Sequence, residues 1–269
     1  MDIARTLNAF LLRDWRAARS YRLAWVLGLW GSFFQLFLYF FLSRIVHAPA
    51  LEVAAGRSVD YFAFVVVGLA LYGFVTTGIG IFADSLRVEQ TTGTLEVLFS
   101  LPTPPSLTIF GTAAYGYIWS LISTTVLLLV SMVFFGFRPV LDPTSLLASV
   151  LALVASLVLF ASLGIVIGAF TLVFKKSGSF VSMVTQMLSL LSGVFFPIAL
   201  LPRPLQWLSE AIPLTWALDV LRQTLLAGEV PVQRIAFLVG ASFIAVPISL
   251  WIFRLSVLRA RQDGSLALY

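Results

Sequence analysis

The sequence contains no cysteine and a single histidine, His47. The lack of cysteine excludes disulfides, thiolate metal ligands and a thiol nucleophile, and one histidine cannot form a histidine-rich metal site. Charged residues are also scarce. They make up 11% of the 269 residues, whereas hydrophobic residues make up 60%, and the mean hydropathy is +1.01. A soluble domain carries about 25% charged residues, so we expect lipid to be the main solvent of this chain.

Three common nucleotide-binding and catalytic sequence motifs are missing as well. The chain has no G-x-x-x-x-G-K-[ST] nucleotide-binding loop, no H-E-x-x-H and no G-x-S-x-G. We therefore predict that the chain is not an enzyme and that, if it moves a cargo, another chain supplies the energy. Two other classes stay open at this point: a membrane-embedded enzyme, which the absent motifs disfavour, and a structural membrane protein without an energy source.

Long apolar stretches make up most of the sequence. A helix needs roughly 20 apolar residues to cross the hydrocarbon core, and six stretches without Asp, Glu, Lys or Arg reach that length. Prolines at the start of the third stretch disfavour helix there, which places its span later. The predicted fold is an all-α integral membrane protein with spans at 23–43, 60–83, 108–136, 145–174, 178–200 and 235–254.

Lysine and arginine are distributed unevenly between the two sides of this topology. Six spans place both termini on one side, which carries eleven Lys and Arg residues against six on the other. Cytoplasmic loops are enriched in these residues. We therefore expect a multi-pass protein of the cell (inner or plasma) membrane with cytoplasmic termini, and we assign the net charge of +5 to topology rather than to a nucleic-acid partner.

The amino-terminal residues 1–22 are predicted to form an amphipathic helix in the membrane interface. Ile3, Leu7 and Phe10 share one half of this helix. Arg5, Arg13 and Arg16 share the other half, where they face water and lipid phosphates. Simple anchoring and contact with a cytoplasmic partner are both consistent with this pattern.

Residues 84–104 separate the second and third predicted spans and contain the segment "RVEQTTGTLEVLFSLP". The segment can continue as a short helix that small residues interrupt, and its prolines stiffen the return to the membrane. Glu89 and Glu96 can point at a basic partner surface. A short, rigid, acidic element suits a contact that transmits force, although an ordinary loop is the alternative.

Residues 201–230 are too hydrophobic for a free loop and too rich in proline for a full span. A re-entrant helical hairpin fits, because irregular backbone is tolerated at membrane depth when other helices cover it. Asp219 and Arg222 are three residues apart and could pair on one helix face, either as a structural pair or as a cargo contact. We take the residues of a predicted outer gate to be Phe196, Pro197, Pro213, Trp216, Asp219 and Arg222.

Polar and aromatic side chains inside the spans are candidates for a cargo path. Buried polar groups in a membrane need partners, so hydrogen bonds between helices are the alternative for the polar members, and lipid contact is the alternative for the aromatic ones. The candidates are Phe33, Gln35, Phe37, Thr76, Thr77, Thr185 and Gln186.

Two motifs resemble those of a known family, the type-2 ABC exporter permeases. The pattern E-x-x-x-G-T-L-E-x-L-x-x-x-P, which starts at Glu89 and ends at Pro102, resembles their first cytoplasmic loop. The stretch "GVFFPIALLP", which is followed by "IPLTWALDVLR", is similar to their second signature. The form "GTLEVLFSLP" is more similar to the drug-resistance and small-amphiphile branch than to the polysaccharide and teichoic-acid exporters, which remain the alternative.

The resemblance implies a mechanism and a set of partners. Residues 84–104 would form a coupling helix seated in a separate ATPase subunit, with residues 1–22 beside it as the interface helix. Two permeases, as a homodimer, would enclose a path for an amphipathic or hydrophobic cargo above two ATPase subunits. These subunits would bind the ATP and Mg, leaving no cofactor in this chain. The residues that would couple to the ATPase are Arg87, Glu89, Gly93, Thr94, Leu95 and Glu96.

Overall fold

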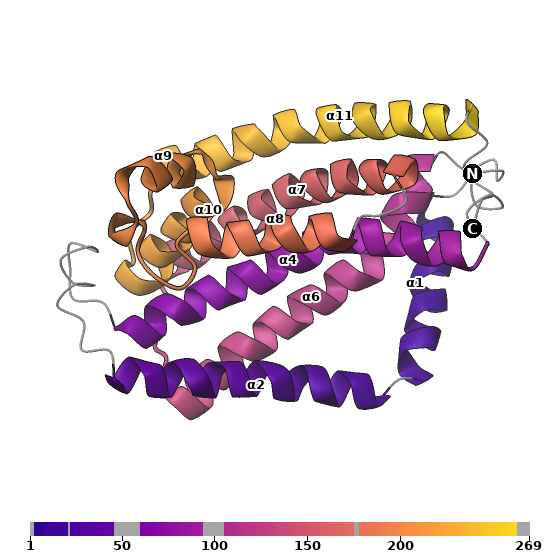
Figure 1. Ribbon diagram of the computed structural model, residues 1–269. Helices are drawn as coiled ribbons and strands as arrows, with labels where there is room; N and C mark the ends of the chain where they lie inside the picture. Colours follow the sequence, from indigo (N-terminus) through magenta and orange to yellow (C-terminus); the bar gives the residue numbers. More distant parts are fainter. Residues whose placement is uncertain (1–2, 21, 46–59, 94–104, 175–177, 263–269) are drawn as a thin grey trace.

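The computed structural model describes residues 3–20, 22–45, 60–93, 105–174 and 178–262, and these residues contain helices but no strand. Figure 1 shows the long helices running lengthwise in one bundle, with α1 crossing them at one end. The long elements are α1 (Ile3–Ser20), α2 (Arg22–Ile45), α4 (Tyr61–Thr91), α6 (Pro105–Phe135), α7 (Pro143–Phe174), α8 (Gly178–Leu191) and α11 (Val232–Gln262). The shorter ones are η1 (Ile198–Leu200), α9 (Arg203–Ala211), α10 (Pro213–Arg222) and the π-helical η2 (Gln223–Ala227).

Five of these helices are long and apolar enough to cross a membrane. Their apolar windows are Val26–Ile45, Tyr61–Glu89, Ala113–Phe135, Pro143–Thr171 and Val232–Arg259. Because a lipid-facing helix can be apolar all round, length and composition identify these elements better than an amphipathic pattern does. The prediction of an all-α membrane protein is confirmed at this level of detail.

The remaining predicted span, 178–200, is a shorter helix than expected. α8 has 14 residues, about 21 Å at 1.5 Å per residue, against a hydrocarbon core of about 30 Å. It ends at Leu191 because the chain then turns through Gly193, which has a φ of +75° that only glycine adopts without strain. Pro197, with a φ of −60° and extended backbone, follows before η1.

Two other helices extend far past the predicted ends of their spans, whereas α2, α6 and α7 differ from theirs by three residues or fewer at each end. The second span was expected to end at residue 83, but α4 continues to Thr91 and so includes the first half of the proposed coupling segment. The last span was expected at 235–254, but α11 runs from Val232 to Gln262 with Pro247 inside it. Charged residues end an apolar run without ending a helix, which explains both differences.

α4 is the centre of the bundle. It packs against α6, α7, α8 and α10, and 72% of its apolar window is buried, compared with 6% for α2. Small residues allow α4 and α7 to approach closely: a Cβ on Gly164 would lie 2.7 Å from the carbonyl oxygen of Gly78. Without a hydrophobic driving force in lipid, such close packing is a main source of helix association.

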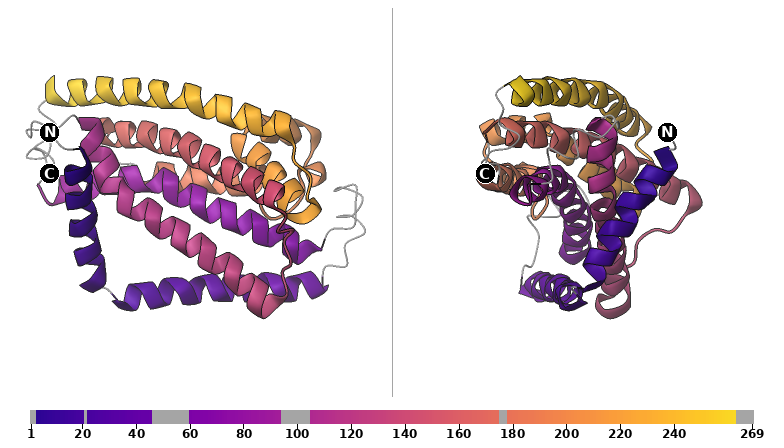
Figure 2. Two further views of the ribbon diagram at one scale, coloured as in Figure 1. Left: turned by 180° about the vertical axis from the view of Figure 1, so that it is seen from behind. Right: turned by 90° about the vertical axis from the view of Figure 1, so that its right-hand side faces the viewer.

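The two ends of the bundle differ in construction. α1, the carboxyl ends of α4 and α11, and the start of α8 gather at one end, and α9 and α10 lie at the other (Figures 1 and 2). We call these the α1 end and the α10 end. Candidate site residues lie at both ends and along α4 between them.

Candidate functional sites at the two ends of the bundle

At the α1 end, α1 packs against α6 through an aromatic side chain and a glycine. A Cβ on Gly111 would lie 2.5 Å from Cδ2 of Phe10, so only glycine lets the Phe10 ring approach this closely. The apolar half of α1 predicted from the sequence is thus used in part for protein contact.

An ion pair connects α1 to α4. Nη1 of Arg13 donates to Oε1 of Glu89 at 2.9 Å, and Nε of Arg13 donates to Oδ1 of Asp14 at 2.8 Å. Burial alone would lower the pKa of Arg13, but Asp14 and Glu89 raise it overall. Glu89 is only 7% exposed. Arg13 and Glu89 therefore bind each other. From the sequence, we expected Arg13 to face water and Glu89 to face a partner surface.

Two threonine side chains and a glycine stand at the end of α4. The Thr91 and Thr92 hydroxyls donate to carbonyl oxygens one turn earlier, and Gly93 follows with a φ of +72°. This glycine conformation is a common way for a helix to end. Arg87 is exposed beside this terminus. Thr94, Leu95 and Glu96 lie outside the described residues.

The other two arginines of the interface helix differ in what the structure describes. Arg16 is exposed in the single chain, and its orientation toward water stays a prediction. Arg5 lies in α1, and its side chain is outside the described part of the chain.

Four of the seven candidate path residues lie on α4 and α8, which pack together. The Tyr72 hydroxyl donates to the carbonyl oxygen of Thr185 at 3.0 Å and joins the two helices. Thr76, Thr77 and Thr185 donate to carbonyls of their own helices, and Nε2 of Gln186 donates to Oγ of Ser182 at 3.1 Å. The hydroxyls are therefore satisfied locally, while the Gln186 side chain lies on an exposed part of α8.

The three candidates on α2 lie apart from that group. Phe33 packs on the rings of Phe134 and Phe135 at the end of α6, with centroids 6.3 and 5.7 Å away. The Phe37 ring packs at a tilt against the Phe41 ring within α2. Gln35 is exposed and has no hydrogen-bond partner among the described residues.

At the α10 end, a break at Ile212 divides two short helices of opposite character. α9 exposes Trp207 and Leu208, whereas the apolar face of α10 is buried against α4 and α7. Pro213 starts α10, and Pro197 is buried close to the partly buried Phe196 in the turn after α8. The Trp216 indole donates to the carbonyl oxygen of Glu210 at 2.6 Å and so ties α10 back to α9.

The predicted pair of Asp219 and Arg222 is wrong. Asp219 forms its ion pair with Arg234 at the start of α11. Nη2 of Arg222 donates to the carbonyl oxygens of Phe64 and Val194, at 3.2 and 3.1 Å. Spacing of three residues permits a pair, but packing turned the two side chains toward different helices.

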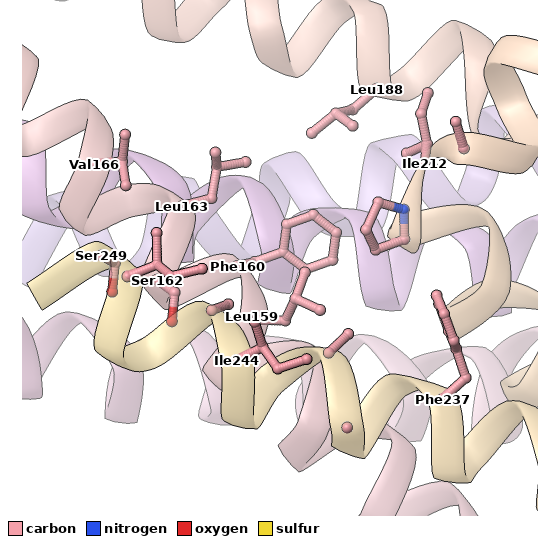
Figure 3. Close-up of a pocket in the computed structure, with 16 residues that line it drawn as sticks. Leu159, Phe160, Ser162, Leu163, Val166, Leu188, Ile212, Phe237, Ile244 and Ser249 are labelled. Carbon is pink, nitrogen blue, oxygen red and sulfur yellow. The ribbon is translucent and has the colours of Figure 1, made fainter. Parts of the chain in front are cut away.

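Two cavities flank the α9–α10 break. The larger, of about 820 Å³, lies between α7 and α11 and is lined almost entirely by apolar side chains, with Phe160 in its middle and Phe237 toward one end (Figure 3). The smaller, of about 440 Å³, is polar and includes Glu210, Asp219 and Arg234. In the described part of the chain, no group of three or more His, Asp or Glu side chains is arranged to hold a metal ion.

Sequence reasoning missed three features of these sites: the Arg13–Glu89 pair, the Asp219–Arg234 pair and the cavity between α7 and α11. The two pairs join residues far apart in the chain, so no local spacing signals them. The small residues Gly240, Ala241 and Ala245 on one side of α11 are a weak sign of the cavity.

These features define an integral membrane protein built around several apolar helices. The family model described as ABC-2 type transporter matches residues 9–226, from within α1 to within η2. The chain belongs to the ABC-2 type transporter family. It is therefore an ABC transporter permease, the membrane component of a transporter and not itself the catalytic one, and such permeases normally work with an ABC ATPase. A comparison with curated proteins found no match.

Proposed function

We propose that this chain is the permease of an exporter that moves an amphipathic or hydrophobic cargo outward across the cell membrane. A separate ATPase subunit, which binds the ATP and Mg, supplies the energy. The observation that carries the proposal is the Arg13–Glu89 ion pair, because it joins the interface helix to α4 directly before the segment proposed to contact the ATPase.

In this proposal, α4 transmits the motion of the ATPase. The ATPase contacts Arg87 and residues 93–104, and displacement there moves α4, a continuous helix of 31 residues that reaches the other end of the bundle. The Arg13–Glu89 pair makes α1 move with α4. A charge-assisted hydrogen bond is stronger than a neutral one, which suits a contact that must hold while the helices move.

Exposed amides on two helices support a second copy of the permease. Gln35 on α2 and Gln186 on α8 are exposed in the single chain, and an amide facing hydrocarbon is unfavourable. Both helices lie toward the viewer in Figure 1. We propose that two copies face each other across these helices, so that both amides, with Thr76, Thr77 and Thr185, face a shared cargo path.

The proposed topology has six passages. α8 and the turn that follows it, to Leu200, complete the sixth passage, α9 and α10 form the re-entrant hairpin over the outer mouth, and both termini face the cytoplasm. The tight packing of α10 against α4 and α7 supports a hairpin held at membrane depth. In this arrangement, movement of α4 reaches the hairpin directly through Arg222 and Phe64.

Co-purification tests the proposal. The tagged chain is expressed with candidate ABC ATPase subunits from the same organism, and we expect a complex of two permeases and two ATPases with ATPase activity. Glu96→Arg should dissociate the ATPase, whereas the matched change Glu229→Arg, on an exposed residue before α11 at the other end, should not. Failure of the chain to bind the ATPase, or equal effects of both changes, would overturn the proposal.

A further inference from the structure

The larger cavity is a cleft at membrane depth. Its walls are α7 and α11, both of which have apolar windows of spanning length, and it is closed by Leu188 of α8 and the α9–α10 break. All but two of its sixteen lining residues are apolar. The exceptions, Ser162 and Ser249, donate to carbonyl oxygens of their own helices, so the cleft presents no unsatisfied polar group from its lining hydroxyls.

The length of the cleft matches one membrane leaflet. Its lining on α11 runs from Phe237 to Ser249, about 18 Å at 1.5 Å per residue. Half of a hydrocarbon core is about 15 Å. The volume of about 820 Å³ falls within the range of about 300–1,000 Å³ that is usual for small-molecule sites. A single hydrocarbon chain extended along the bundle fits both dimensions.

The end of the cleft at the α9–α10 break adjoins the smaller, polar cavity. Ala211, Ile212 and Pro213 line the cleft. Glu210, directly before them, and Thr215, two residues after them, line the polar cavity. The Trp216 ring of the polar cavity packs at a tilt against Phe237 of the cleft, with centroids 4.9 Å apart. The two cavities thus share a wall, apolar on one side and polar on the other.

The chemistry of the polar cavity favours a headgroup with a positive charge. Asp219 and Arg234 neutralise each other, while the Glu210 carboxylate has no ion pair among the described residues. The Thr215 hydroxyl oxygen is buried without a hydrogen-bond partner in the described part of the chain. One free carboxylate and one free hydroxyl can bind an amine and a phosphate oxygen, respectively.

We propose that a bilayer phospholipid with an amine-bearing headgroup is held here. One of its acyl chains fills the cleft between α7 and α11, and its headgroup amine binds Glu210. The site lies in the leaflet on the α10 side of the membrane. The inference requires only that the chain spans a membrane and is independent of the proposed transport function.

Filling the cleft tests where the acyl chain lies. A Cβ on Gly240 would meet no atom within 4 Å, so Gly240→Leu starts a side chain from open space at the wall of the cleft. Gly28 on α2 also has open space around it, and Gly28→Leu is the matched control. The protein is purified from nanodiscs of phosphatidylethanolamine and phosphatidylglycerol, and native mass spectrometry counts the retained phospholipids. We expect Gly240→Leu to retain one fewer per chain and Gly28→Leu to match the unaltered protein.

The headgroup is tested by competition between the two lipids. The unaltered protein should retain phosphatidylethanolamine at least tenfold over phosphatidylglycerol, and Glu210→Gln should remove most of that preference while leaving the count unchanged. Ala245→Leu, which also faces the cleft, repeats the count if Gly240→Leu elutes as an aggregate.

Four results would overturn all or part of the proposal. Equal lipid counts in the cleft and control variants would show that no lipid is held in the cleft. Loss of dimer in Gly240→Leu at an unchanged lipid count would assign the cleft to a second copy of the chain. Loss of transport at an unchanged lipid count would assign it to cargo. Retention without a headgroup preference would overturn the assignment of Glu210.

Discussion

The guanidinium of Arg222 lies over the ring of Phe64, with its central carbon 3.4 Å from the ring centroid. The same side chain donates to the carbonyl oxygens of Phe64 and Val194. One partly buried arginine on α10 thereby connects α4 and the turn after α8. Arginine, unlike lysine, can contact an aromatic face and donate several hydrogen bonds from the same planar guanidinium.

Removal of this side chain should destabilise the bundle. Arg222→Ala leaves a cavity and removes the donor to both carbonyls, and we expect a loss of about 2–4 kcal/mol from these effects together. Thermal unfolding in detergent, followed by fluorescence, measures the loss. Arg203→Ala is the control, because Arg203 is exposed at the start of α9 and should have little effect. Equal unfolding temperatures for the two variants would contradict the role of Arg222.

Gly68 lies on α4 where this helix meets the turn after α8. A Cβ there would lie 2.2 Å from the carbonyl oxygen of Val194, so Gly68→Ala should force α4 and the turn apart and cost about 1–3 kcal/mol. Gly73→Ala, on the same helix with open space around it, should be neutral or slightly stabilising, because alanine favours helix. The two variants are compared in the same unfolding assay, and a stable Gly68→Ala protein would show that the junction is loose.

The contact of α1 with α6 predicts a coupled pair of substitutions. Gly111→Val should push away the Phe10 ring, which already lies 2.5 Å from a Cβ at that position, at a cost of about 1–3 kcal/mol. In Phe10→Ala with Gly111→Val, the loss should be smaller than the sum of the single losses, since contacting residues are not additive. A double-mutant cycle of unfolding free energies measures this. Strict additivity would contradict the contact between α1 and α6.

The Asp219–Arg234 pair should contribute little to stability. Its side chains are 49% and 39% exposed, and exposed pairs contribute about 0–1 kcal/mol. We therefore expect Asp219→Asn to shift stability by less than about 1 kcal/mol, with a difference that shrinks as salt is added. Unfolding at low and high salt checks this. A large, salt-independent loss would indicate that the pair is more deeply buried than the structure shows.

The sequence was sufficient to locate the long apolar helices, but not to predict where each one ends or which residues contact each other between helices. Apolar length alone located α2, α4, α6, α7 and α11, because lipid imposes a minimum length on any spanning helix. It could not locate where α4 ends, since Arg87 and Glu89 interrupt the apolar run while the helix continues to Thr91. In α4, charged residues end the apolar run, whereas the helix itself ends only before Gly93.

The ion pairs of the candidate sites could not be predicted from the sequence, because they join residues on different helices. Glu89 and Arg13 were each interpreted from their own helix, and each was directed at a solvent or partner surface. Their contact across 76 residues depends on α1 folding back over α4 and α6, which local pattern does not encode. The same holds for Asp219, whose partner was sought three residues away and lies at the start of another helix.

The ratio of cargo transported to ATP hydrolysed tests the central claim most directly. The permease and its ATPase are reconstituted in liposomes with a fluorescent long-chain cation, and Arg13→Gln, Glu89→Gln and the double variant are compared. Arg16→Gln, on an exposed arginine of the same helix, is the control. We predict that both single changes lower the ratio about tenfold, that the double variant is no worse, and that the control is unchanged. An unaltered ratio in Arg13→Gln and Glu89→Gln would contradict the account.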